Sequence, residues 1–136
     1  MIRKFLSLIP VCALLFSCGS NKVQPPTTDT EVAQAFIRST LDNNIDEAKK
    51  YILKDEQNTQ LIETYGRLYV KQDKTKTDGY KKADIIINQI EPVVSDSLEI
   101  IYYTNSFDPK EKNKLKLVRV DGKWLIDFKY TLSGNL

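Results

Sequence analysis

Residues 114–127, KLKLVRVDGKWLID, decide the fold class of this chain. Two stretches of alternating apolar and polar residues flank the pair Asp121-Gly122. Aspartate followed by glycine suits the positive φ angles of a two-residue turn, so the segment predicts a tight antiparallel hairpin. The alternation continues to residue 130, and we expect the last strand to divide its side chains between two faces. Trp124, Ile126, Phe128 and Tyr130 share one face, and Leu125, Asp127 and Lys129 share the other.

Two further segments before this hairpin, residues 80–94 and 97–107, are also rich in β-branched and aromatic side chains. The sequence therefore predicts four strands, and short polar stretches connect them. Pro92 cannot donate a ladder hydrogen bond and should mark a bend or bulge. We expect one face of the sheet to be apolar and covered. The other face should be mixed and open, with Ile101, Tyr103 and Leu125 on it.

Helical periodicity precedes the strands. Thr28 and Glu31 form a capping box, and apolar side chains then recur at helical spacing up to Leu41. Asn44 caps a second, short helix, and a third pattern follows: Leu61, Tyr65, Leu68 and Tyr69. Residues 71–79, KQDKTKTDG, are charged and are expected to form a loop. The sequence thus predicts an α+β domain, with three N-terminal helices packed on one face of a curved, mostly antiparallel four-stranded sheet.

Residues 29–131 resemble the nuclear transport factor 2-like (cystatin-like) superfamily, and in particular its small domains of unknown function in bacterial lipoproteins. An opening helix pattern and a closing V-x-x-D-G-K-W-x-I hairpin carry this resemblance. The matching residues are Ala33, Phe36, Leu41, Asp46, Glu47, Ala48, Val118, Asp121, Gly122, Lys123, Trp124 and Ile126. The resemblance implies a cone-like domain whose mouth can hold a small molecule. It also implies that a homodimer, or a complex with another envelope protein, could form through the open sheet face.

Three tyrosines are the candidate ligand-binding residues of such a cone: Tyr65, Tyr69 and Tyr102. The favoured hypothesis is a non-catalytic domain that binds a small amphipathic ligand or an envelope partner. The alternative is an acid–base enzyme similar to the ketosteroid-isomerase-like members, which combine a carboxylate base with a tyrosine donor. Asp84 and Asp127 are the candidate bases. A cavity of about 300 Å³ or more with a buried carboxylate would favour either hypothesis over a filled cone.

Composition excludes several classes of protein. The chain has no histidine, which removes the commonest general base and metal ligand. Its two cysteines, Cys12 and Cys18, both lie near the N-terminus, so we expect neither a metal site, nor a cofactor, nor a disulfide framework in the domain. The formal charge of +2 falls to zero once Arg3 and Lys4 are removed, and a neutral domain is a poor nucleic-acid binder.

The N-terminus has the order of a secretory signal: a basic pair, an apolar run over residues 5–16, and small residues. Residues 15–18, LFSC, resemble the lipobox of bacterial lipoproteins, in which the cysteine is acylated and becomes the first residue of the mature protein. We therefore expect a signal peptide at residues 1–17, a lipidated Cys18 with a flexible tether at residues 18–28, and the domain at residues 29–136. The resemblance implies a bacterial cell-envelope protein, anchored to the outer membrane, with its domain facing the periplasm or the cell surface.

Overall fold

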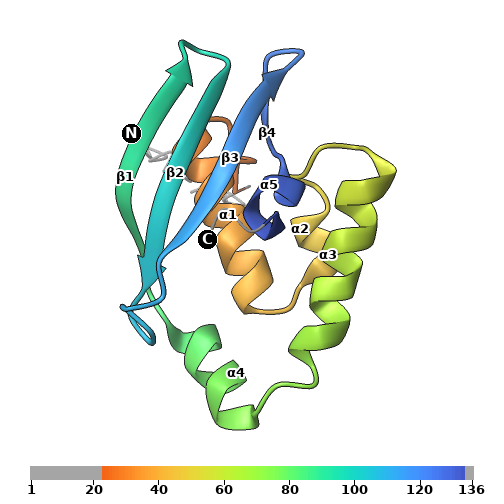
Figure 1. Ribbon diagram of the computed structural model, residues 1–136, viewed down its shortest axis with the longest axis vertical. Helices are drawn as coiled ribbons and strands as arrows, with labels where there is room; N and C mark the ends of the chain where they lie inside the picture. The colour runs from red at the N-terminus through yellow and green to blue at the C-terminus, as the bar shows by residue number, and fades with distance from the viewer. Residues whose placement is uncertain (1–22, 134–136) are drawn as a thin grey trace, which may run out of the picture.

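The computed structural model describes residues 23–133, so the expected signal peptide and Cys18 lie outside the described residues. Four helices precede the sheet: α1 (Asp29–Leu41), α2 (Ile45–Ala48), α3 (Glu56–Tyr69) and α4 (Lys74–Lys82). Four antiparallel strands follow, β1 (Ile85–Val94), β2 (Leu98–Asn105), β3 (Asn113–Val120) and β4 (Lys123–Ile126), and a short helix α5 (Phe128–Leu132) comes last. The strands form one open sheet in the order β1-β2-β3-β4, so the predicted α+β class and antiparallel meander are confirmed (Figure 1).

Local signals in the sequence place the first helices as predicted. The Thr28 hydroxyl oxygen accepts a hydrogen bond from the backbone N–H of Glu31. The Glu31 carboxylate accepts one from the backbone N–H of Thr28, which completes the capping box. The Asn44 side chain caps α2, and the Asp55 side chain caps α3. Each cap satisfies a backbone donor that a helix end otherwise leaves without a partner.

The β3–β4 hairpin turns at Asp121 and Gly122, whose φ angles are 50° and 78°, as the Asp-Gly pair predicts. Strand β1 lies at one edge of the sheet and is irregular. Its pairing with β2 shifts register between Ile87 and Gln89, and again between Pro92 and Val94. The bulge expected at Pro92 is therefore present.

Two elements differ from the sequence prediction. Residues 74–82, expected as loop up to residue 79 and as strand from residue 80, form helix α4, whose N-terminus is capped by Asp73. The last strand ends at Ile126 rather than at residue 130. Phe128 begins α5, and its buried ring packs between the sheet and α3. Phe128 and Tyr130 alternate correctly for a strand, but burial of Phe128 against the helices outweighs continuation of the ladder.

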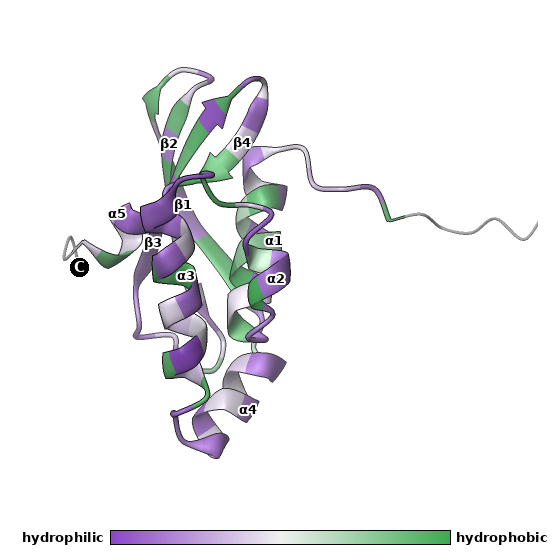
Figure 2. Cartoon of the chain, turned by 90° about the vertical axis from the view of Figure 1, so that its right-hand side faces the viewer, coloured by the Kyte–Doolittle hydropathy of each residue, from purple (hydrophilic) through white to green (hydrophobic). Residues whose placement is uncertain are grey.

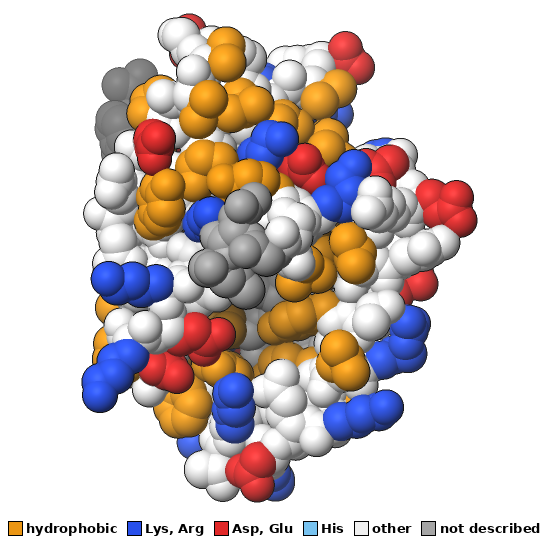
Figure 3. Space-filling model, viewed as in Figure 1, with side chains coloured by type: hydrophobic (Ala, Val, Ile, Leu, Met, Phe, Trp, Pro, Cys, Tyr) orange, Lys and Arg blue, Asp and Glu red, His pale blue; other side chains and the backbone are white. Residues whose placement is uncertain are grey.

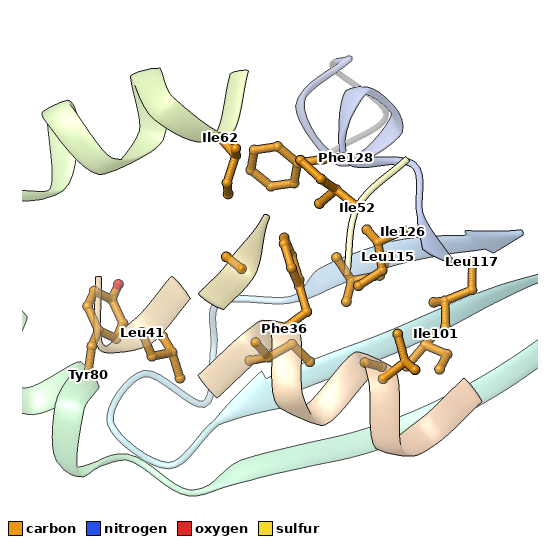
Figure 4. Packing of buried hydrophobic residues seen from close by; sticks show 14 residues of the cluster. Phe36, Leu41, Ile52, Ile62, Tyr80, Ile101, Leu115, Leu117, Ile126 and Phe128 are labelled. Atoms are coloured by element: carbon orange, nitrogen blue, oxygen red, sulfur yellow. The ribbon is translucent and has the colours of Figure 1, made fainter. Parts of the chain in front are cut away.

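The core lies between the sheet and α1, and Figure 2 shows apolar residues, in green, in α1 and in the strands. From the sheet it receives Ile101, Leu115, Leu117 and Ile126, all 0% exposed. Phe36 and Ile37 of α1, together with Ile52, Ile62 and Phe128, complete its centre (Figure 4).

The expected assignment of the sheet faces is wrong for two residues. Ile101 pairs with Leu115, and Tyr103 pairs with Asn113, so both point toward the helices rather than to the open face. Leu125 does lie on the opposite side, in register with Val118. Apolar residues occur in consecutive positions in β2, so its sequence alternation fits either orientation of the strand.

Candidate ligand-binding site

A cavity of about 260 Å³ opens between the sheet and the helices, at the end of the domain that carries α4. Six elements, α1, α3, α4, β2, β3 and α5, contribute to its wall together with the α3–α4 and β2–β3 connections. Its main lining side chains are Phe36, Tyr65, Tyr80, Tyr103, Glu111 and Phe128. Figure 3 shows hydrophobic side chains in the hollow between the sheet and α3. The size is slightly below the 300 Å³ or so at which small-molecule sites usually begin.

Five aromatic side chains contribute to the lining. The ring centroids of Phe36 and Phe128 lie 5.5 Å apart, and those of Tyr65 and Phe128 lie 6.2 Å apart, both in edge-to-face geometry. Tyr80 packs in the same way on Phe107, with centroids 5.3 Å apart. Rings at steep angles enclose a space instead of filling it as a stack would, and each presents either a ring face or an edge to a ligand.

Three tyrosine hydroxyls surround this space. The Tyr80 hydroxyl donates to Oε2 of Glu111 at 2.8 Å, and the Tyr65 hydroxyl lies 3.5 Å from the backbone oxygen of Thr40. The Tyr103 hydroxyl has no hydrogen-bond partner among residues 23–133. It is thus a donor that a bound molecule could use.

Burial and the Glu111 carboxylate keep these hydroxyls protonated. Burial is the main cause that raises the pKa of Tyr65 to about 12. The pKa values of Tyr80 and Tyr103 are raised further, again mainly by burial. The negative charge of Glu111 raises the pKa of all three tyrosines. At neutral pH the cavity therefore presents neutral phenols beside a carboxylate.

Two charged side chains stand at the rim. Glu111 is exposed, and of its two carboxylate oxygens only Oε2 is hydrogen-bonded within the described part of the chain. Lys76 is also exposed, and its ammonium lies 5.5 Å from the centroid of the Tyr80 ring. Glu111 forms no ion pair with any residue between 23 and 133.

The three predicted tyrosines do not converge on the cavity. Tyr65 lines it, as predicted. Tyr69 is buried one helical turn further along α3, and its hydroxyl donates to the backbone oxygen of Leu41 at 2.6 Å. Tyr102 points to the open face of the sheet, where its hydroxyl donates to Glu91 at 3.0 Å. Tyr102 therefore lies away from this cavity and lines a separate hollow of about 440 Å³, and Tyr69 supports the wall without lining it.

The sequence analysis missed Tyr80, Tyr103 and Glu111. Tyr80 lay at the start of an expected strand and is instead on α4. Tyr103 was assigned to the open face because of the ambiguous alternation in β2. No local signal in the sequence distinguishes Glu111, which lies in the β2–β3 connection, from other charged loop residues.

Neither candidate catalytic base lies in the cavity. Asp84 is exposed immediately before β1, and its backbone N–H donates to the Ser106 hydroxyl. Asp127 pairs with Lys116 at 3.4 Å and precedes α5. The tyrosine–aspartate pocket of the enzymatic hypothesis is thus not assembled from these residues.

A larger groove of about 580 Å³ lies between residues 23–27, α2 and the β3–β4 hairpin. We consider it the weaker site because the segment at residues 23–27 forms one wall. This segment belongs to the expected tether, and Val23 within it is 94% exposed. A wall that packs so little against the domain does not preorganise a binding site.

Two further observations limit the chemistry of the described residues. Within residues 23–133, no three acidic, histidine or cysteine side chains are grouped so that they could hold a metal ion. No helix in that range is long and apolar enough to cross a membrane.

Comparisons of the chain with protein-family models, with curated proteins and with solved structures find no match.

Proposed function

We propose that the chain is a bacterial envelope lipoprotein, anchored through acylated Cys18, whose α+β domain binds a small amphipathic ligand without catalysis. The observation that carries the binding part of this proposal is the cavity of about 260 Å³ with aromatic walls and a polar rim. An apolar enclosure with few polar groups binds the body of a ligand and fixes its orientation. The lipobox-like sequence at residues 15–18 supports the anchored arrangement.

The ligand part is tested by native mass spectrometry of the lipidated protein purified from its own membrane. We expect a retained small molecule in the wild type. Asn113→Trp should abolish retention because Asn113 lines the cavity and a tryptophan there would occupy it. Lys114→Trp is the matched control, since the next residue of β3 points to the opposite side of the sheet, over the Tyr130 ring. Equal retention by both variants would refute the cavity as the binding site.

The anchor is tested separately with a radioactive fatty acid in growing cells. We expect the wild-type protein to be labelled and Cys18→Ala to remain unlabelled and to leave the membrane fraction. Two or three acyl chains on one residue bind a bilayer almost irreversibly, because each buried CH₂ contributes about 0.8 kcal/mol. Labelling that persists in Cys18→Ala would contradict the assignment.

A further inference from the structure

We infer that the ligand of the cavity is a small organic ammonium ion with apolar substituents, and this inference rests on the proposed binding function. Four observations on the cavity support it: the orientation of the aromatic rings, the free capacity of Glu111, the position of Lys76, and the shortage of groups that would bind an anion.

The aromatic walls favour a cation. The faces of aromatic rings carry negative potential, and a cation within about 6 Å of a ring centroid is attracted to it. Phe36, Tyr65 and Phe128 all line the cavity, and Phe128 packs edge to face on Phe36 at 66° and on Tyr65 at 85°. Tyr80 and Tyr103 extend this wall from α4 and β2.

A carboxylate with free acceptor capacity stands beside these rings. Glu111 accepts one hydrogen bond, from the Tyr80 hydroxyl, whereas a carboxylate offers about four acceptor positions. The negative charge of Glu111 contributes to the raised pKa of three tyrosines, Tyr65, Tyr80 and Tyr103. An ammonium ion in the cavity would therefore lie in the field of Glu111 and next to three polarised phenols.

The described part of the chain does not supply this cation itself. Lys76 lies at the rim, and its ammonium lies 5.5 Å from the Tyr80 ring centroid without reaching the Glu111 carboxylate. This contact has the geometry of a cation–π interaction with the Tyr80 ring. Glu111 has no cationic partner within residues 23–133, so its carboxylate remains available to a bound cation.

An anionic ligand has few binding groups here. Lys76 is the one cationic side chain among the lining residues, and the lining contains no arginine. A carboxylate or phosphate ligand would also be repelled by Glu111.

The test compares two probes of the same shape, choline and its uncharged analogue 3,3-dimethylbutan-1-ol, in titration calorimetry on the full lipidated chain in a neutral detergent. We expect the wild type to bind choline at least about tenfold more tightly than the neutral analogue. Glu111→Gln should remove this preference. Glu91→Gln is the matched control, because Glu91 accepts a tyrosine hydroxyl in the same way on the open sheet face. It should bind both probes as the wild type does.

The remaining outcomes separate this inference from the proposed function. Equal binding of the two probes, unchanged in Glu111→Gln, would overturn the ammonium preference and leave the binding function intact. Failure of both probes, with a neutral or anionic molecule retained in native mass spectrometry, would overturn the ammonium preference in the same way. Failure of both probes, with no retained molecule of any kind, would overturn the two proposals together.

Discussion

Replacement of Glu99 by glutamine should stabilise the folded protein above pH 7 and have little effect near pH 4. Glu99 lies on the helix-covered face of β2 and is only 6% exposed. Its carboxyl group is close to Asp29, the first residue of α1, and its Oε1 finds no hydrogen-bond partner among residues 23–133. A charged carboxylate in this position is unfavourable because it is desolvated and faces a second carboxylate.

The size of the effect follows from the pKa. Burial, followed by the hydrogen bond and the charge of Asp29, raises the pKa of Glu99 from 4.5 to about 7. The folded protein therefore holds this proton more tightly than the unfolded chain does. The resulting stabilisation is complete below about pH 4.5 and is lost as the pH rises to about 7. The shift corresponds to at most about 3 kcal/mol, at 1.36 kcal/mol for each pKa unit.

Urea unfolding between pH 4 and pH 8 measures this contribution as the difference between Glu99→Gln and the wild type, which cancels the other titrating groups. We expect a difference close to zero at pH 4 and an advantage of about 2 to 3 kcal/mol for the variant at pH 8. Glu91→Gln, on an exposed residue of the neighbouring strand, should show no such trend. A difference between Glu99→Gln and the wild type that stays constant across the range would refute the reasoning.

Three further substitutions test the packing in the same urea assay. Asn58→Ala should lower the free energy of unfolding by about 3 kcal/mol, because Asn58 is 0% exposed and its Oδ1 accepts from the backbone N–H of Lys129 at 2.9 Å. A decrease of less than about 1 kcal/mol would contradict the importance of this hydrogen bond. Gly66→Ala should destabilise the folded protein by about 1 kcal/mol, because the new Cβ would lie 2.5 Å from Cγ1 of Ile45. This cost opposes the better helix propensity of alanine. A variant more stable than the wild type would show that Ile45 moves aside freely. Thr28→Ala should cost about 1 kcal/mol through loss of the N-cap, whereas Thr28→Ser should restore it, and equal stability of the two variants would argue against the capping box.

The sequence predicted the elements whose signals are local. The capping box of α1 and the turn at Asp121-Gly122 depend on neighbouring residues, and both form as expected. Helix α3 contains Gly66, a residue that ordinarily weakens a helix, at the point where Ile45 of α2 packs closely against it. The sequence does not show this contact, because Ile45 and Gly66 lie far apart in the chain.

Helix α4 was missed because it has almost no apolar face. Its sequence, KTKTDGYKK, buries only Tyr80, and hydrophobic periodicity is therefore absent. The available signals were the capping residue Asp73 and the basic pair Lys81-Lys82 near the end of the helix.

The cavity combines one of the three candidate tyrosines with residues that the sequence did not single out. An aromatic cavity formed, and Tyr65 lines it. The error at Tyr102 and Tyr103 is a shift of one position in β2, which moves a side chain to the other face of the sheet. Glu111 could be identified only once the fold had placed its loop beside Tyr80, because no sequence pattern links the two residues.

The irregular edge of the sheet affects whether copies of this protein associate through their strands. Strand β1 exposes Ile86, Ile90, Val93 and Val94, and such a strand would ordinarily recruit the edge of a second molecule. Pro92 lacks the N–H group that a neighbouring chain would need, and the two register shifts twist the strand away from a straight template. Both features work against the recruitment of a second strand at this edge, even though its side chains are apolar.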